Sequence, residues 1–152
     1  MREIATWTDI GAPPARVWEV LTDLEHYRDW NPFVREASGS VAVGSRLRLR
    51  MHPAHRRPMT FHPRVRAVVP ERELRWRGRL LVPGLFDGEH RFVLTDLDGG
   101  GTRLVQSERF TGLLVPFLKR TIADTAGDFE AFNRALRRRA EGRATPADCS
   151  GR

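Results

Sequence analysis

The sequence contains little cysteine, little lysine and no long apolar stretch. Its one cysteine, Cys149, excludes an internal disulfide framework and any cysteine-based zinc site. No apolar run approaches the roughly 20 residues that a membrane-spanning helix needs. The first residues, Met1 to Ile4, also lack the apolar stretch of a signal peptide. We therefore expect a protein of the reducing cytoplasm without a membrane span.

What is present fits one globular domain. The chain has 152 residues, of which 40 % are apolar, and it contains 8 Phe and 4 Trp. That length and that apolar content suffice for one hydrophobic core, and they argue against disorder of the whole chain. Residues 141–152 are small, polar and proline-containing. We expect a single domain over 1–140 and a flexible polar tail over 141–152.

The positive charge is concentrated in one quarter of the chain. The net charge is +7, and eleven arginines fall between Arg46 and Arg79 against only Glu71 and Glu73. These arginines alternate with apolar residues, which predicts neighbouring strands whose outer faces share the arginines. One interpretation is a solvated sheet face, and the other is contact with an anionic partner. Because the charged face lacks the aromatic residues that stack bases, a nucleic acid partner is disfavoured.

Hydrophobic periodicity predicts an α+β chain. A strand over 4–10 precedes short helices over 13–21 and 24–29, and a short strand over 33–38 follows. Turn residues then separate antiparallel strands, which we place at 46–51, 60–69, 73–81, 85–97 and 102–110. The Asp98-Gly99 pair is typical of a hairpin. From about Leu114 to Arg139 the apolar residues recur every three or four positions, which predicts one long helix with Pro116 in its first turn.

Three segments carry a resemblance to a known superfamily. They are Ile10 to Asp23 (IGAPPARVWEVLTD), Tyr27 to Phe33 (YRDWNPF) and Gly101 to Leu114 (GTRLVQSERFTGLL). They resemble the START/Bet v 1-like (SRPBCC) superfamily, and in particular its bacterial polyketide cyclase/dehydrase-like members. The resemblance implies a helix-grip fold, in which a curved antiparallel sheet of six to seven strands wraps around a long C-terminal helix, with two short helices after the first strand.

The resemblance further implies a hydrophobic pocket between sheet and helix. Members bind lipids, polyketides, hormones or other apolar molecules, and a minority are cyclases or other enzymes. A curved sheet and a straight helix also cannot meet along their full length, so a cavity between them is expected on geometric grounds. Alternatively, the inward side chains simply pack as a core. The side chains that strand parity and helix periodicity place inward are Leu47, Leu49, Met51, Val65, Leu74, Trp76, His90, Phe92, Leu94, Leu104, Gln106, Glu108, Phe110, Phe117, Ile122, Thr125 and Phe129.

Two polar residues on the inward faces are candidates for chemistry. His90 and Glu108 lie at similar distances from the Asp98–Gly101 turn, so we expect them to approach each other across the hairpin. They could form a structural pair at the cavity rim, orient a ligand, or act as catalytic acid and base.

No cofactor or metal is expected. His52, His55 and His62 lie in or beside one loop, but the adjacent Arg56 and Arg57 argue against a bound cation. The glycines at 99–101 lack the lysine and the following helix of a phosphate-binding loop.

We therefore expect the protein to bind a hydrophobic or amphipathic small molecule, lipid-like or polyketide-like, in an internal cavity. One alternative is an aromatase/cyclase-type enzyme that acts on a polyketide-like substrate in the same cavity. Another is an interaction protein that uses the arginine-rich face to contact an acidic protein or nucleic acid. A homodimer is compatible with the sequence. The identity of the ligand is not determined by the sequence.

Overall fold

The computed structural model describes residues 1–80 and 82–142. Most of the expected polar tail over 141–152, including Cys149, therefore lies outside the described residues. None of the helices in the described part is long and apolar enough to span a membrane. In chain order the elements are β1 (Arg2–Ile10), α1 (Pro14–Thr22), η1 (Leu24–His26), α2 (Tyr27–Trp30), β2 (Val34–Ser38), β3 (Arg48–Met51), β4 (Met59–Phe61), β5 (Arg64–Val69), β6 (Glu73–Leu80), β7 (Phe86–Asp96), β8 (Thr102–Thr111), η2 (Val115–Phe117) and α3 (Lys119–Ala140).

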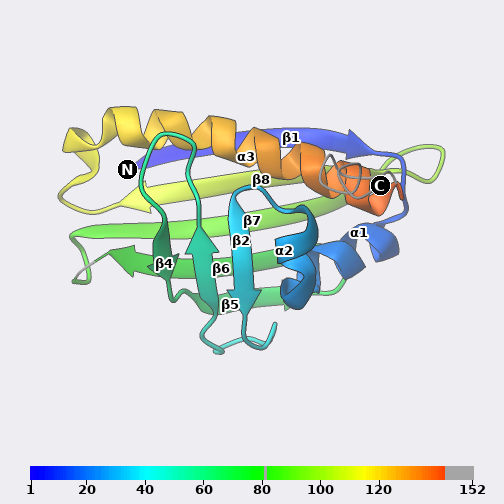
Figure 1. Ribbon diagram of the computed structural model, residues 1–152, viewed down its shortest axis with the longest axis horizontal. Coiled ribbons are helices and arrows are strands. Elements are labelled where there is room, and N and C mark those ends of the chain that lie inside the picture. Colours follow the sequence, from blue (N-terminus) through cyan, green and yellow to red (C-terminus); the bar gives the residue numbers. More distant parts are fainter. Residues whose placement is uncertain (81, 143–152) are drawn as a thin grey trace, which may run out of the picture.

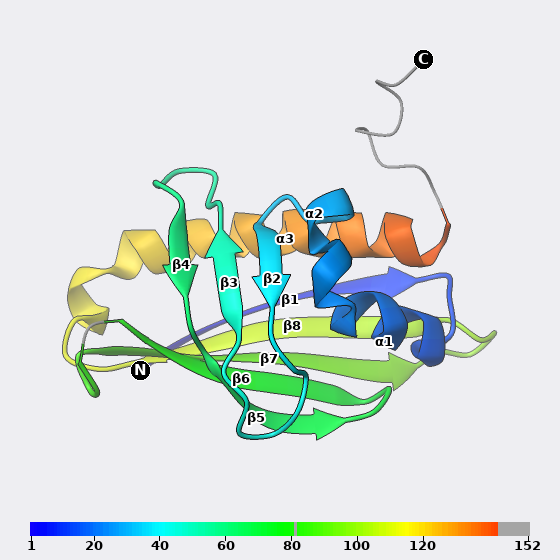
Figure 2. The ribbon, with the colours of Figure 1, turned by 60° about the horizontal axis from the view of Figure 1, so that its bottom comes forward.

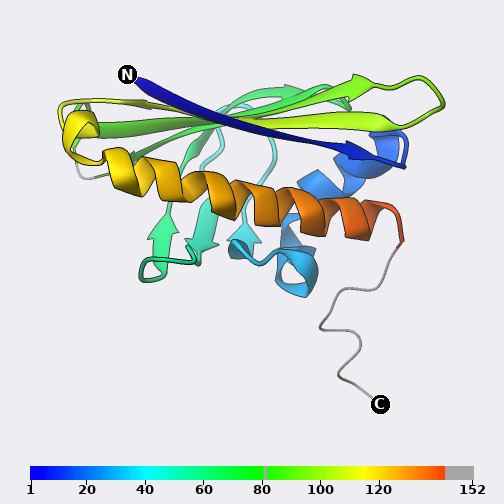
Figure 3. The same ribbon diagram turned by 90° about the horizontal axis from the view of Figure 1, so that it is seen from above.

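The main sheet is antiparallel and carries the long helix on one face. Its five strands run in the order β1-β8-β7-β6-β5. Helix α3 lies along this sheet, and the short helices and remaining strands flank α3 on the same side (Figures 1 and 3). Successive strands from β5 to β8 are antiparallel hairpin neighbours, because their connections are too short for the crossover that a parallel pair needs. The predicted α+β fold, with its long C-terminal helix and two short helices after the first strand, is confirmed.

A second, smaller sheet stands beside α3. Strands β2, β3 and β4 form it, and they project from the plane of the main sheet (Figure 2). The single strand predicted over 60–69 is therefore two strands in two sheets. Pro63 separates them because it has no N–H for a ladder, although its carbonyl accepts a hydrogen bond from the Leu47 amide at 2.8 Å. One bridge between Arg46 and Arg64 still connects the two sheets.

The long helix begins later than its hydrophobic pattern predicts. Residues Val115 to Phe117 form a separate 3-10 turn, and Leu118 leaves the helical region before α3 starts at Lys119. Pro116 occupies this turn, which accommodates the missing N–H. As a result the Phe117 side chain is 83 % exposed and does not face the sheet, which contradicts its expected inward position.

Aromatic rings fill the core between α2, α3 and the sheet. The Phe132 ring meets Trp30 and Phe92 at centroid distances of 5.4 and 5.5 Å, and Tyr27 packs on the same ring. The Tyr27 hydroxyl donates to the Leu21 carbonyl oxygen, and complete burial raises the pKa of Tyr27 far above its ordinary value. This cluster anchors the two short helices to the middle of α3.

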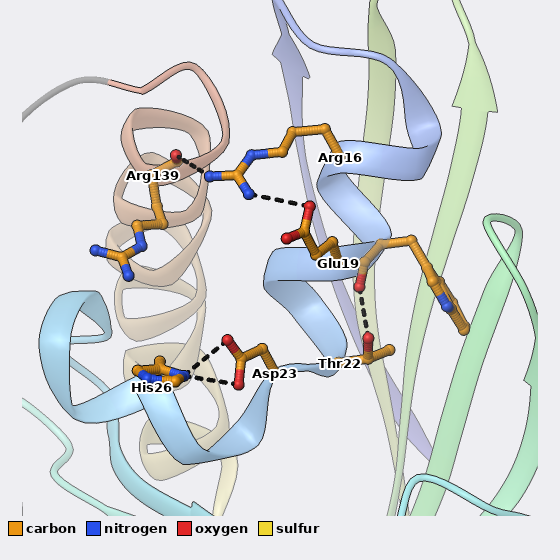
Figure 4. Close-up of polar contacts among 7 residues, drawn as sticks. Arg16, Glu19, Thr22, Asp23, His26 and Arg139 are labelled. Carbon is orange, nitrogen blue, oxygen red and sulfur yellow. Dashed lines mark hydrogen bonds and ion pairs between the residues drawn. The ribbon is translucent and has the colours of Figure 1, made fainter.

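Polar contacts join α1 to the C-terminal end of α3 (Figure 4). Arg16 donates to the Arg139 carbonyl oxygen at 3.4 Å and to a Glu19 carboxylate oxygen at 3.0 Å. The same carbonyl also accepts a hydrogen bond from the Gly142 amide at 3.2 Å, so the helix end is capped by both groups. Nearby, Asp23 lies 2.8 Å from the His26 ring, and this hydrogen bond raises the pKa of His26. The Arg16 contact joins α1 to the C-terminal end of α3, and the cavity lies toward the other end of the helix.

Candidate functional site

A cavity of about 100 Å³ lies between the main sheet, α3 and the smaller sheet. One water molecule needs roughly 10–15 Å³ of space measured in this way, so the cavity is several times larger than a single hydration site. Its walls are mainly aromatic and aliphatic, with a few polar side chains. That composition is typical of a pocket for a small organic molecule.

The cavity occupies only one half of the strands. On β6 the lining includes Trp76 but not Leu74, and on β7 it includes Phe92 but not Leu94. All four side chains share the inward face, so their position along the strand decides which of them reaches the cavity. Of the inward residues predicted from sequence, those that line the cavity are Leu49, Met51, Trp76, His90, Phe92, Gln106, Glu108, Phe110, Ile122 and Thr125.

The other predicted lining residues do not reach the cavity. Phe117 is exposed, as described above. The remainder are fully or almost fully buried because they pack against one another and against α1 and α3 in the main core; they are Leu47, Val65, Leu74, Leu94, Leu104 and Phe129. Alternation of polar and apolar residues assigns a face of the sheet, and it does not say how far along that face the packed core extends.

Two glycines in the cavity wall were not among the lining residues predicted from sequence. Gly78 and Gly88 are paired across β6 and β7, and both line the cavity. A Cβ at Gly88 would lie only 2.5 Å from Glu108 Oε1, so the carboxylate occupies space that any other residue would take. The sequence does carry a signal for these positions, because a glycine at an inward position inside an alternating strand often marks a place where another group approaches the backbone closely.

Glu108, His90 and Gln106 form a polar line along the cavity wall. The predicted register is confirmed, since His90 and Glu108 are directly opposite each other, with His90 Nδ1 3.6 Å from Glu108 Oε2. On its other side, His90 Nε2 lies 3.0 Å from Gln106 Nε2. Because the Gln106 amide N–H can only donate, the acceptor in this contact is His90 Nε2, which leaves the ring proton on Nδ1, facing the carboxylate. Gln106 Oε1 is buried and has no hydrogen-bond partner.

Aromatic neighbours hold the His90 ring in place. The ring stacks on Trp76 at a centroid distance of 5.2 Å, and the edge contact with Phe129 is 4.8 Å. Phe92 lies 4.6 Å away. Because these contacts restrict rotation of the imidazole, its two nitrogens stay directed at Glu108 and Gln106.

The loop between β3 and β4 closes one side of the cavity. Arg56 donates to Thr125 Oγ1 at 3.1 Å, and the Ala54 amide donates to Asp128 Oδ1 at 2.9 Å. Both acceptors lie on α3, so the loop is tied to the helix. Arg56 Nε is buried without a hydrogen-bond partner, and Arg56 also lines the cavity. The sequence alone does not indicate these contacts between the loop and the helix. Among the described residues, no three His, Cys, Asp or Glu side chains gather to hold a metal ion.

The arginine-rich segment does not form one continuous positive face. Arg48 and its neighbours on β3 belong to the smaller sheet, which separates them from the arginines of β5 and β6. On the main sheet, Arg91 donates twice to Glu73 at 3.0 and 3.1 Å, which lowers the pKa of Glu73. Arg77 and Asp87 form a further pair at 3.1 Å. The outer face therefore carries mixed charges.

Solved structures of similar fold are numerous. The Zhui aromatase/cyclase from Streptomyces sp. R1128 is 22 % identical, with a TM-score of 0.76 over 96 % of this chain and 97 % of that one. A START superfamily protein from Mycobacterium smegmatis is 20 % identical, with a TM-score of 0.71 over 92 % and 97 % of the two chains. Protein MLL2253 from Mesorhizobium loti is 22 % identical, with a TM-score of 0.71 over 90 % and 95 %. At these identities the likeness shows the fold alone.

Sequence comparison gives the family. No curated protein sequence matches the chain. The sequence model of one family, described as polyketide cyclase / dehydrase and lipid transport, matches residues 1–141. That match covers nearly the whole chain and includes every element that builds the cavity. The protein therefore belongs to the polyketide cyclase/dehydrase and lipid transport family.

Proposed function

We propose that the protein binds an apolar or amphipathic small molecule in the cavity between the main sheet and α3. The observation that carries this proposal is the unfilled, mostly apolar space beside Gly78, a strand position that has no side chain to fill it. Well-packed interiors leave few voids larger than a water molecule. A retained cavity of this composition is best explained by a molecule that fills it.

Gln106 supplies the polar contact that would select the ligand. The residue is 1 % exposed, and its Oε1 has no hydrogen-bond donor. A buried polar atom without a partner costs about 1–3 kcal/mol. A ligand with a hydroxyl or N–H group would satisfy this atom, so the favoured ligand has an apolar body and at least one hydrogen-bond donor, as hydroxylated lipids and polyketide-like phenols do.

The donor preference can be measured with two probes of the same shape. We expect 1-naphthol to bind the wild-type protein about three- to tenfold more tightly than naphthalene, because one hydrogen bond contributes roughly 0.5–1.5 kcal/mol. Gln106→Leu should abolish the difference. Calorimetric titration measures both affinities, and mass spectrometry of molecules extracted from the purified protein identifies a natural ligand.

The control uses a second buried amide outside the cavity. Asn133 is 2 % exposed and also has an unpartnered carbonyl oxygen, so Asn133→Leu makes the same chemical change at a distance. This control should keep the preference for naphthol. If the wild-type protein binds neither probe and carries no extractable apolar molecule, the proposed function is wrong. If it binds both equally, only the role of Gln106 is wrong.

A second candidate function is catalysis in the same cavity, of the aromatase/cyclase type on a polyketide-like substrate. The polar line of Glu108, His90 and Gln106 favours it, because an imidazole proton facing a carboxylate is an arrangement that can transfer a proton.

Catalysis and binding respond differently to Glu108→Gln. An enzyme should lose about 10²–10⁴-fold in turnover of a poly-β-ketone substrate, because a general acid or base contributes that much, while naphthol binding persists. Chromatography of the products measures turnover. Unchanged product formation in the variant, or none in the wild-type protein, would rule out this candidate.

A further inference from the structure

Three large apolar side chains protrude from one end of the molecule. Val82 is 58 % exposed, Leu113 76 % and Phe117 83 %. They lie in the β6–β7 and β8–α3 connections, which meet at the N-terminal end of α3 (Figures 1 and 3). We call this group the apolar tip. Single exposed apolar residues are ordinary, but a group of them at one end marks an interaction surface.

The two connections that form the apolar tip are fastened together. The Leu113 amide donates to the Gly84 carbonyl at 3.1 Å, and the Leu114 amide donates to the Leu85 carbonyl at 3.0 Å. Gly112 has a φ of +119°, and a Cβ there would lie 2.5 Å from the Leu85 carbonyl oxygen, so only glycine permits this approach. Beneath the tip, a small apolar cluster separate from the main core includes Phe110 and Val115. The exposed side chains therefore project from an ordered support.

Unpaired cations surround the apolar tip. Arg79, Lys119 and Arg120 are exposed, and none of them makes an ion pair within residues 1–80 and 82–142. Lys119 and Arg120 begin α3 immediately after the tip. Asp87, which is opposite Arg79 in the sheet, is already paired with Arg77. This end of the molecule therefore combines protruding apolar groups with free positive charge, in a chain whose net charge is +7.

The cavity extends to the same end. Its lining includes Phe86 at the start of β7, Phe110 near the end of β8, and Thr121 in the first turn of α3. Arg79 belongs both to the cavity lining and to the cations around the tip. Any partner that binds the apolar tip would therefore lie next to the cavity.

We propose that the apolar tip docks on a lipid bilayer that contains anionic lipids. Apolar side chains flanked by basic residues suit the interface of such a bilayer, because the apolar groups enter the acyl boundary while the cations approach lipid phosphates. Three side chains at a narrow end are too few for a stable protein interface, which buries about 800 Å² per partner. A symmetric contact between two copies would also place the same cations against each other. The proposal does not depend on the identity of the cavity ligand.

Vesicle sedimentation tests the docking surface. We expect the wild-type protein to sediment with vesicles of phosphatidylcholine and phosphatidylserine, and to do so much less with phosphatidylcholine alone or at 0.5 M salt. The double variant Leu113→Glu and Phe117→Glu should lose at least tenfold in vesicle affinity. Charge reversal at Lys119 and Arg120 should cause a loss of similar size.

The matched control places the same charges elsewhere. Val43 and Val69 are 66 % and 48 % exposed and lie away from the tip, so the variant Val43→Glu and Val69→Glu should bind vesicles nearly as well as the wild-type protein. Equal losses in the two double variants, or no wild-type binding to anionic vesicles, would overturn the proposal. If the protein instead dimerises as its concentration rises, and the tip variant does not, then the apolar tip binds a second copy of the chain and not a bilayer. Naphthol binding should be unchanged in the tip variant, so failure of this proposal is distinct from failure of the proposed function.

Discussion

Replacing Gly78 with leucine is expected to weaken binding of naphthol by roughly a hundredfold while the fold remains intact. A Cβ at this position would meet only the Pro63 Cβ, at 3.6 Å, and Gly78 lines the cavity. The backbone there is part of a regular strand, so leucine causes no backbone strain. Its side chain would occupy the space that the ligand needs.

The control is the same substitution at a glycine outside the cavity. Gly127 lies on the exposed side of α3, with no atoms near a Cβ, so Gly127→Leu should retain naphthol binding and strengthen the helix slightly. Calorimetric titration and circular dichroism of both variants give affinity and fold. Undiminished naphthol affinity in a folded Gly78→Leu protein would mean that the probe binds elsewhere.

Replacing Phe132 with alanine is expected to lower the free energy of unfolding by about 3–5 kcal/mol. Its side chain is 1 % exposed, and its ring packs against those of Tyr27, Trp30 and Phe92. Removing the ring would leave a void where α2, α3 and the sheet meet. Urea unfolding followed by circular dichroism measures the change.

Phe117→Ala is the matched comparison for this prediction. The structure places Phe117 in the apolar tip, where it is 83 % exposed, so its removal should change the free energy of unfolding by less than about 0.5 kcal/mol. The hydrophobic pattern alone placed it inward and would predict a large loss. If both variants lost a similar amount of unfolding free energy, Phe117 would be buried, as the hydrophobic pattern predicts, and its exposed position in the structure would be wrong.

Local patterns predicted the parts of the site that depend on a single hairpin. Alternation along β7 and β8 fixes which side chains face inward, and the Asp98–Gly101 turn fixes the register that pairs His90 with Glu108. Both features are determined within about twenty residues of chain. They could therefore be derived without knowing where α3 lies.

Features that depend on distant contacts were not predictable in this way. Nothing local distinguishes Trp76, which lines the cavity, from Leu74, which is buried in the core on the same face of the same strand. That difference arises because α1 packs with α3 over one half of the sheet, whereas α3 covers the cavity half without α1. The contacts of Arg56 and Ala54 with α3 likewise join segments about seventy residues apart, so strand and helix periodicity carry no information about them.

The start of α3 differs from the prediction for another reason. The apolar spacing from Leu114 onward suits a helix, and Pro116 is permitted in a first turn. The chain instead forms a 3-10 turn and begins the α-helix at Lys119. The tight attachment of Gly112 to the β6–β7 connection constrains the direction in which the chain leaves β8, and this constraint comes from outside the helix.

The cavity itself is tested most directly by an NMR titration with 1-naphthol. Glycine amide signals lie in an uncrowded region of the spectrum, and Gly78 and Gly88 are both in the cavity wall. We predict saturable shifts of these two amides together with the Trp76 indole signal. Saturable shifts confined to the outer face of the sheet or to the apolar tip, with Gly78 and Gly88 unmoved, would contradict the account.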